Sequence, residues 1–398
     1  MTAQVTILTS SCAVLAADSA VTVSSNTGQK VYTGVEKIYP LSESRPTAAL
    51  VYGSASLIGV PWGTLLSEFR QRFGDLAYTN IDEQAQRLLA FLAERLDDRI
   101  TANGQEMREA RVAGLMSALL SEARDRFVRT SMEAESNEEF VPEKVVAGIG
   151  QQLRDILAVE RANWNAAERS TNLTESAERA HHAAARPNVN AIRKQVFAGL
   201  SLRAAVSRAV TDVALLSLTR QTPSGITSPS EGGLVLVGFP EGDFWPKYVE
   251  FTFDGVGLPG LRYWWTSSGG CEGPHDPLVH AFAQADGVMT IMNGIHPEYL
   301  AMLDTRLEIA GFDTEEIARV FKDTRDRWEQ RRTSPILDTL DVMPPPDLCE
   351  VAESLVAITA LWQRMRGALE TVGGTISVAV LAPGGPLRWA KRPTLSSS

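Results

Sequence analysis

The sequence predicts an α+β fold in which helices cover both outer faces of two stacked antiparallel sheets, a four-layer αββα sandwich with a large helical insertion. Three observations predict this fold. Short β-rich runs fill residues 3–53, a helical pattern extends over about 82–219, and strands return from residue 232 before further helices and one last strand. We therefore expect residues 1–81 to form the first part of the core, 82–219 the insertion, and 220–398 the second part of the core with additional helices.

The N-terminal region has the pattern of several strands followed by one helix. Its β-rich runs are VTILTS (5–10), CAVLAA (12–17), GVEKIYPL (34–41) and TAALVYG (47–53). Ser, Gly and Asn residues separate these runs, as expected between short strands. A helix is predicted from about Leu57 to Phe73, where Gly74 ends it.

The insertion is predicted from helical spacing. Two sets of apolar residues each share one helix face: Leu89, Leu92 and Leu96, and then Val146, Ile149, Leu153 and Ile156. Pro142 and Pro187 interrupt the stretch, and a cluster of turn residues over 221–231 closes it. The segment 166–185 is rich in Ala, Glu, Arg, Ser and Thr, and we expect a loop in its middle.

Strands and helices return in the C-terminal part. The strand runs are GGLVLVGFP (232–240), KYVEFTFDGV (247–256) and LRYWWTS (261–267), and the predicted helices cover 277–293, 297–309 and 314–332. A last helix carries an apolar stripe at three- and four-residue spacing: Leu348, Val351, Leu355, Ile358, Trp362, Met365 and Leu369. Two glycines at 373–374 end this helix, and residues 375–381 form the expected final strand.

Composition excludes several classes of protein. The chain of 398 residues is 44% hydrophobic and 22% charged, which is typical of a soluble globular protein. Its net charge of −10 argues against broad binding of nucleic-acid phosphates. No run approaches the roughly 18 uninterrupted apolar residues of a membrane span, and residues 1–17 lack the basic start of a signal peptide. We therefore expect a cytoplasmic protein with no nucleic-acid partner and no membrane partner.

Other motifs for a functional site lack the context they need. Residues 255–260 fit GxGxxG by letter, but strand-like sequence and not a helix follows them, which favours a β-turn. The sequence has no phosphate loop, no GxSxG elbow and no HExxH or Cys/His cluster, so we expect no cofactor and no metal. Cys12 and Cys349 fit the pattern of small core residues. Cys271, in a Gly-rich loop, is the candidate for a reactive thiol.

One ordered set of residues indicates a reaction chemistry. Thr2 becomes the N-terminus if Met1 is removed, and Asp18, Lys37 and Gly53 follow it near the ends of predicted strands. An N-terminal threonine can pass its hydroxyl proton to its own α-amine, whose ordinary pKa is about 7.7–8.0. A neighbouring lysine lowers the pKa of that amine and hydroxyl, and a buried lysine needs a carboxylate partner. A glycine N–H can stabilise the oxyanion.

Each of these residues also has a plain structural interpretation. The Asp-Ser sequence that begins at Asp18 is common in ordinary turns, because both side chains bond their own backbone. Lys37 is equally compatible with a solvated residue at a sheet edge. The functional interpretation therefore depends on the order of the whole set and not on any one member.

This set resembles the β-subunits of the proteasome and their bacterial relatives, which are N-terminal nucleophile hydrolases. The likeness lies in Thr2 and in the stretches VLAADSAVT, GVEKIYPL and ALVYGSASLIG, within about residues 2–75. By this resemblance Thr2 is the nucleophile and the base amine, and Asp18 orients the site. Lys37 tunes the pKa, and Gly53 supplies the oxyanion N–H. The interval between Asp18 and Lys37 is a few residues longer than in the family, so we expect a small insertion in the intervening hairpin.

The sequence also departs from the family pattern. The family places an Asp and a Ser just before a Gly-Gly pair near the C-terminus, where they support the threonine amine. Here LETV (369–372) precedes the glycines at 373–374, so Val372 takes the place of the serine. A second serine of the family's site would correspond to Ser267 or Ser268.

Three functions remain open. The first is a threonine-dependent hydrolase of amide or peptide bonds, with Thr2 as nucleophile after removal of Met1. The second is a catalytically inactive, proteasome-like assembly or scaffold protein. The third is a small-molecule amidase whose closed pocket is roofed by the helical insertion. We expect a homo-oligomer, and the substrate of an active protein would be a peptide or a small amide.

Overall fold

The computed structural model describes residues 2–25, 28–133, 142–170, 173–223, 231–311, 314–365 and 372–392. The fold combines α-helices with antiparallel β-sheets, in agreement with the predicted α+β class. The chain divides into two compact units. The first unit comprises Met1–Leu92, Gly232–Thr252 and Trp265–Ser398, and the second comprises Ala93–Glu231 and Phe253–Trp264.

The second unit differs in extent from the insertion expected over 82–219. Helix α2 (Ile81–Glu133) begins in the first unit and enters the second only at Ala93. The hairpin tip Phe253–Trp264 also belongs to the second unit. Helical spacing marks where helices lie along the chain, but it does not show which later segment packs with them.

The first sheet has five strands in the order β12-β1-β2-β13-β14. The strands are β1 (Ala3–Leu8), β2 (Ala13–Ala17), β12 (Leu278–Ala283), β13 (Ser377–Leu381) and β14 (Arg388–Lys391). The predicted strands over 5–10, 12–17 and 375–381 correspond to β1, β2 and β13. The short strand β14 was not predicted from the sequence, which is consistent with its mostly exposed residues.

The helix predicted over 277–293 is wrong in its first half. Residues 278–283 form β12, which pairs with β1 from Ala3↔Ala283 to Leu8↔Leu278, and helix α6 begins only at Asp286 and ends at Asn293. A short apolar run is ambiguous between a strand and a buried helix. The free edge of β1 decides the outcome, because a strand there satisfies its backbone hydrogen bonds.

The second sheet has the order β11-β10-β9-β6-β5. Its strands are β5 (Ile38–Pro40), β6 (Thr47–Gly53), β9 (Glu231–Gly238), β10 (Lys247–Val256) and β11 (Leu261–Gly270). The GxGxxG-like residues at 255–260 lie at the turn between β10 and β11, as predicted. A separate hairpin of β3 (Val21–Ser25) and β4 (Gly28–Tyr32) occupies the interval between Asp18 and Lys37.

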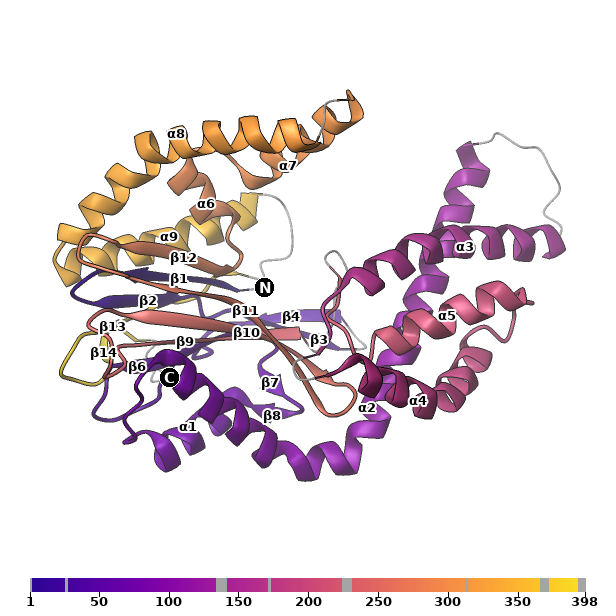
Figure 1. The fold of residues 1–398 in the computed structure, drawn as a ribbon, viewed down its shortest axis with the longest axis horizontal. Helices are drawn as coiled ribbons and strands as arrows, with labels where there is room; N and C mark the ends of the chain where they lie inside the picture. The colour runs from indigo at the N-terminus through magenta and orange to yellow at the C-terminus, as the bar shows by residue number, and fades with distance from the viewer. Residues whose placement is uncertain are drawn as a thin grey trace. The chain divides into compact units, whose positions relative to one another are not determined.

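The two five-stranded sheets pack face to face, and helices cover their outer faces (Figure 1). One buried cluster takes members from both sheets, among them Leu15, Leu50, Val235 and Leu381. On the other face of the first sheet, Val5 and Val14 pack with residues of the covering helices. These helices are α6, α8 (Thr314–Val342) and α9 (Pro345–Met365). Helix α7 (Pro297–Ile309) contacts α6 and α8. Helix α8 is longer than the predicted 314–332 and contains Pro335.

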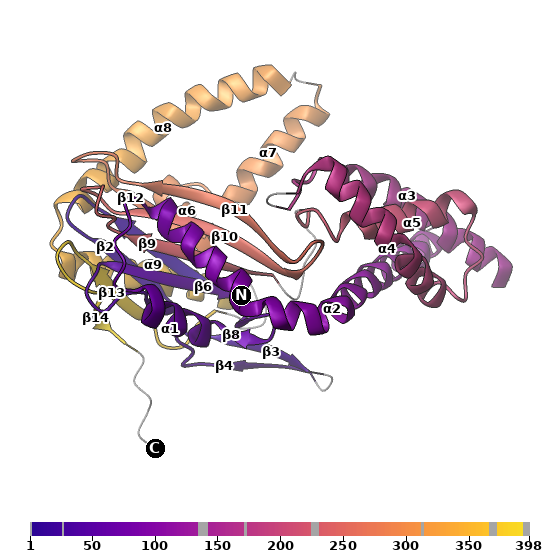
Figure 2. The ribbon, with the colours of Figure 1, turned by 60° about the horizontal axis from the view of Figure 1, so that its bottom comes forward.

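Helix α1 (Trp62–Phe73) and the start of α2 lie at the second sheet (Figure 2). The rings of Phe69 in α1 and Phe91 in α2 lie 5.6 Å apart. The helix predicted from Leu57 begins five residues late, because a small hairpin of β7 (Ser56–Leu57) and β8 (Val60–Pro61) precedes it. The turn of this hairpin has φ of +52° at Ile58 and +73° at Gly59. A β-branched residue rarely adopts such a φ, so the sequence does not signal this turn.

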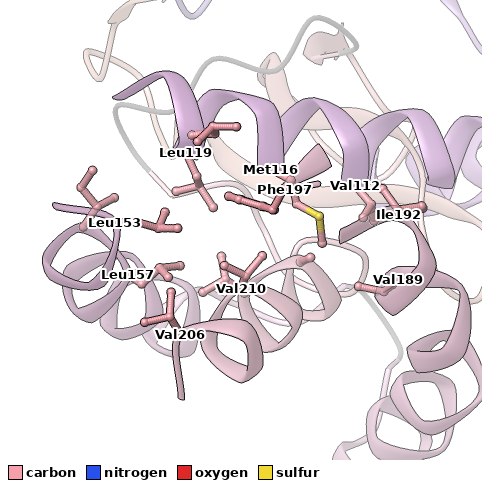
Figure 3. Packing of buried hydrophobic residues seen from close by; sticks show 14 of the residues in the cluster. Val112, Met116, Leu119, Leu153, Leu157, Val189, Ile192, Phe197, Val206 and Val210 are labelled. Atoms are coloured by element: carbon pink, nitrogen blue, oxygen red, sulfur yellow. The ribbon is translucent and has the colours of Figure 1, made fainter. Parts of the chain in front are cut away.

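The second unit is built on helices α2, α3 (Pro142–Ala166), α4 (Glu175–Val196) and α5 (Ala204–Leu216). Apolar residues from all four helices meet in one core, including Met116, Leu153, Ile192 and Val210 (Figure 3). Of the predicted interruptions, Pro142 begins α3, but Pro187 lies inside α4.

The second unit also contains a buried ion cluster. Glu178 in α4 is 4% exposed, and its carboxylate accepts hydrogen bonds from Arg220 Nε at 2.8 Å and from Arg169 Nε at 2.9 Å. Thr219 Oγ1 also donates to this carboxylate at 3.0 Å. Arg220 Nη2 donates to the second oxygen of Glu178 at 3.1 Å, and Nη1 donates to the backbone carbonyls of residues 164, 165 and 167. The cluster therefore ties the end of α3 and the start of α4 to the segment after α5.

Candidate functional site

Thr2 stands at the start of β1, in the buried interior of the first unit. It is 3% exposed, and its carbonyl accepts a hydrogen bond from the N–H of Gln284 at 3.1 Å. The hairpin of β1 and β2 places Asp18 next to it, because Gln4 pairs with Ala17 and the N–H of Asp18 then donates to the carbonyl of Ala3 at 3.1 Å. The antiparallel register therefore brings a carboxylate sixteen residues away in the chain beside the threonine.

Lys37 completes a three-residue cluster. Its Nζ donates to Thr2 Oγ1 at 3.0 Å and to Asp18 Oδ1 at 2.7 Å. Lys37 is 5% exposed and precedes β5, and its carbonyl accepts the N–H of Val51 at 3.0 Å. It is therefore not a solvated edge residue. The structure brings Thr2, Asp18 and Lys37 into direct contact.

The Asp18 carboxylate is held by backbone donors as well as by the lysine. Oδ1 accepts the N–H of Ala3 at 3.0 Å, and Oδ2 accepts those of Ala20 at 3.2 Å and Gly373 at 3.0 Å. The N–H of Ser19 donates to the carbonyl of Gly373 at 3.2 Å. Because a buried charge needs such partners, this arrangement keeps Asp18 in place as the counter-ion of Lys37. It also brings the first of the two predicted glycines to the site.

Burial changes the pKa of Lys37. Burial lowers the pKa of its ammonium group, and the charge of Asp18 and the hydrogen bond to it oppose this effect only in part. A lysine with a lowered pKa exchanges protons more readily near neutral pH than an exposed one. Its Nζ is in hydrogen-bond contact with the hydroxyl of Thr2, so the geometry permits a proton to pass between these two groups.

A small cavity of about 70 Å³ lies next to this cluster. Thr2, Lys37 and Gly53 all line this cavity, and Asp18 contacts Lys37 through a hydrogen bond. The four predicted site residues therefore lie together. Gly53 ends β6 with a φ of +74°, a conformation that favours glycine. The remaining lining residues are mostly apolar or aromatic: Ala20, Val21, Val35, Glu36, Tyr39, Val51, Tyr52, Ser54 and Ala55.

Sequence reasoning missed several of these neighbours. Tyr39 follows Lys37 by two residues, and its hydroxyl donates to the carbonyl of Glu36 at 2.6 Å. Burial raises the pKa of Tyr39 to about 12, so it stays neutral. Ser19 is also buried, and within the described part of the chain its Oγ has no hydrogen-bond partner. The signal for these residues was their position next to the predicted ones, since Ser19 follows Asp18 and Tyr52 precedes Gly53.

The positions where the sequence departs from the family pattern are partly described. Val372 is 1% exposed and packs in the core above the first sheet, so no hydroxyl occupies its position. Residues 369–371 lie outside the described residues. Ser267 donates to Glu250 Oε2 at 2.6 Å, and Ser268 is exposed. Neither of these two serines lines the cavity beside Thr2.

Other kinds of site receive no support in the described ranges. They contain no group of three or more His, Cys, Asp or Glu residues that could hold a metal ion, and none of their helices is long and apolar enough to cross a membrane. Cys271 is fully buried, and burial raises the pKa of its thiol to about 12, so the expectation of a reactive thiol there is not supported.

No protein-family model matches this chain, and a comparison with curated proteins finds no relative by sequence.

Proposed function

We propose that this protein is a hydrolase of amide or peptide bonds that uses Thr2, exposed by removal of Met1, as its N-terminal nucleophile. The observation that carries the proposal is the contact of Lys37 Nζ with both Thr2 Oγ1 and Asp18 Oδ1 in a buried site beside a cavity. An N-terminal nucleophile needs a group that takes up its hydroxyl proton, and a cation nearby favours that transfer. Lys37 lies in hydrogen-bond contact with the buried Thr2 hydroxyl and so meets this need.

In the first chemical step Thr2 Oγ attacks the carbonyl carbon of the scissile amide. The hydroxyl proton moves to a base, which is the free α-amine of Thr2 or the Lys37 amine. A new C–O bond forms, and the carbonyl electrons move to oxygen. The N–H of Gly53, at the rim of the cavity, would stabilise this oxyanion.

The tetrahedral intermediate then collapses. The C–N bond breaks, the leaving amine takes up the proton that the base holds, and an ester between the acyl group and Thr2 remains. Water adds to this ester with the same base as proton acceptor. The acid is released, and Thr2 Oγ regains its proton.

The fold supports this proposal. Two antiparallel sheets share one core, and helices cover their outer faces. We propose that this arrangement is the four-layer αββα sandwich of the N-terminal nucleophile hydrolases and that the protein is related to proteasome β-subunits. A homo-oligomeric, cytoplasmic protein remains part of the same proposal.

The size of the cavity favours small groups near the scissile bond. A volume of about 70 Å³ holds only a few water molecules or a short side chain. This observation favours peptides with small residues at that position, or small amides, over substrates with large aromatic groups. The small-molecule amidase therefore stays as a second candidate with the same Thr2 chemistry.

The buried Val372 favours the remaining candidate, an inactive assembly or scaffold protein. No hydroxyl at that position supports the threonine amine. Ser19 Oγ, which has no hydrogen-bond partner among the described residues, offers a different hydroxyl near Gly374, because a Cβ at Gly374 would lie 2.6 Å from it. Activity therefore depends on whether this geometry replaces the serine of the family pattern.

Intact-mass spectrometry and labelling with a small peptide epoxyketone test the proposal. Such a reagent reacts with both the hydroxyl and the free amine of an N-terminal threonine, and its full mass is added. We expect mature protein that begins at Thr2 and gains one reagent mass. Thr2→Ala is the matched control, because a small alanine still allows removal of Met1 but lacks the hydroxyl. Retention of Met1, or equal labelling of Thr2→Ala, would refute the catalytic proposal.

A further inference from the structure

Glu250 is a carboxylate in the middle of the second sheet. It lies in β10 and is 6% exposed, and both of its oxygens accept hydrogen bonds from hydroxyl groups. Tyr52 Oη in β6 donates to Oε1 at 2.5 Å, and Ser267 Oγ in β11 donates to Oε2 at 2.6 Å. Hydrogen bonds from a hydroxyl to a charged carboxylate are short and strong, and these two distances lie in that range. Glu250 therefore links β10 to β11 on one side and to β6 on the other side.

Tyr52 reaches Glu250 across an intervening strand. Strand β9 lies between β6 and β10, and Gly233 is the register partner of Tyr52 in β9. A Cβ at Gly233 would lie 1.8 Å from Cζ and 2.1 Å from Cε1 of the Tyr52 ring. The ring therefore lies directly on the backbone of Gly233. Any side chain at residue 233 would move the Tyr52 hydroxyl away from Glu250.

This arrangement matters because Gly53 follows Tyr52. Gly53 ends β6 at the rim of the cavity and pairs with Gly232, so a glycine faces a glycine at this point. Glycine-rich backbone has the greatest conformational freedom and does not hold a turn by itself. The N–H of Gly53 belongs to the peptide group that joins it to Tyr52. Fixing the Tyr52 side chain at its far end therefore fixes the direction of that N–H.

We propose that Tyr52, Glu250 and Ser267 form a positioning device that holds the Gly53 N–H toward the substrate carbonyl beside Thr2. The inference rests on the proposed function, because the oxyanion exists only if Thr2 is a nucleophile. These three residues are positioning residues, since they act through the backbone at Gly53. Misplacement of a catalytic group by about 1 Å lowers rates by roughly 100-fold, so an anchor of this kind has a measurable effect.

The first test is the kinetics of epoxyketone labelling at Thr2, with the inactivation rate separated from the binding constant of the reagent. Tyr52→Phe removes one hydroxyl and keeps the ring on Gly233. We expect the rate to fall by about 10- to 100-fold and the binding constant to change by less than about two-fold. Glu250→Gln should give an intermediate loss, because one of its two polar atoms still accepts a hydrogen bond.

Thr252→Val is the matched control. Thr252 Oγ1 shares a hydrogen bond of 2.7 Å with Thr266 Oγ1, between the same strands β10 and β11, and its removal should leave the labelling rate unchanged. A rate for Tyr52→Phe equal to that of the wild type would overturn the positioning role. So would a change confined to the binding constant.

The second test does not depend on labelling. The NMR order parameter of the Gly53 N–H bond reports how firmly that peptide is held on the ps–ns timescale. We expect it to fall from about 0.85 toward about 0.6 in Tyr52→Phe and to stay unchanged in Thr252→Val. A lower order parameter in a protein that does not label at Thr2 would refute the proposed function and leave the anchor in place. An unchanged order parameter in Tyr52→Phe would refute the anchor, whether or not the protein labels.

Discussion

Each compact unit contains a buried carboxylate with basic partners, and the two clusters use their donors differently. In the second unit, Glu178 binds two guanidinium groups, and Arg220 Nη1 donates to backbone carbonyls. In the first unit, Asp18 binds one lysine and three backbone N–H groups. Lys37 directs another donor at the hydroxyl of Thr2, beside a cavity.

The pKa shifts of the two clusters also differ: the shift at Glu178 favours its charged form, and the shift at Lys37 disfavours its charged form. Burial alone would raise the pKa of Glu178, but hydrogen bonds from Arg220, Arg169 and Thr219 outweigh it and lower the pKa to about 2. The charged form of Glu178 is therefore fully stabilised. For Lys37 burial wins over Asp18, and the pKa of the cation is lowered. A cluster whose groups stay charged stabilises the fold. A cluster with a lysine of lowered pKa next to a hydroxyl can exchange a proton with that hydroxyl.

The largest expected effect is at Lys37. Lys37→Met keeps the length of the side chain and removes the amine, so the rate of epoxyketone labelling at Thr2 should fall by at least about 100-fold. The free energy of unfolding should fall by about 3–5 kcal/mol, because Asp18 loses its cation. Labelling kinetics and denaturant unfolding measure the two effects. A variant that labels and unfolds like the wild type would show that Lys37 is not part of a reactive site.

Arg220→Met makes the matching change in the second unit. It should also lower the free energy of unfolding, by about 3–5 kcal/mol, because a buried carboxylate loses a partner. Labelling at Thr2 should stay within about two-fold of the wild type under conditions where the protein is folded. Loss of labelling in folded Arg220→Met would mean that the two clusters are coupled and that the contrast between them does not hold.

Lowering the pH should reduce the contribution of Glu178 to stability, and this effect is smaller than those of the two substitutions above. The folded pKa of Glu178 lies below its ordinary value of 4.5, so its stabilising contribution is complete above pH 4.5 and is lost as the pH falls toward 2. The shift corresponds to about 3 kcal/mol. Unfolding by urea from pH 6 down to pH 3 should show the stability advantage of the wild type over Glu178→Gln shrinking. Glu122→Gln, at an exposed ion pair with Arg126, is the control and should change stability by less than about 0.5 kcal/mol. A constant advantage across this range would contradict the depressed pKa.

The smallest expected effect is at Cys271. Because its buried thiol has a pKa raised to about 12, native protein at pH 8 should take up no iodoacetamide at this residue within an hour, while denatured protein should react fully. Peptide mapping by mass spectrometry measures both. Rapid native alkylation would return Cys271 to the list of candidate nucleophiles and weaken the case that Thr2 alone has that role.

Local pattern and the order of residues carried much of the prediction. The hairpin of β1 and β2 follows from two adjacent β-rich runs, and its register places Asp18 beside the start of β1. The helix α9 was predicted for the same reason, because its spacing is contained within one element. The predicted stripe is only partly its buried face, since Leu348 and Leu355 are buried whereas Ile358 and Met365 are exposed. The contact of Lys37 with Thr2 could not be predicted from local pattern, because it depends on how two sheets face each other. It was expected only from the resemblance to a known family.

Features that depend on distant partners could not be predicted. The assignment of residues 278–283 as a strand depends on the free edge of β1, more than 250 residues earlier. The bond between Tyr52 and Glu250 joins residues 198 positions apart and depends on a glycine in a third strand. No local signal marks a glutamate in a strand as a buried anchor. Such pairings become visible only when the strand order is known.

The hydrogen bond from Gly373 to Asp18 has a consequence for the order in which the partners of the Asp18 carboxylate are synthesised. Asp18 receives this donor from a residue 355 positions later in the chain, and β2 acquires its second neighbour only when β13 is in place. Synthesis of the chain therefore places Thr2, Asp18 and Lys37 well before the donor at Gly373. A chain that has not yet reached residue 373 carries the three-residue cluster but lacks one of the backbone donors that hold the Asp18 carboxylate.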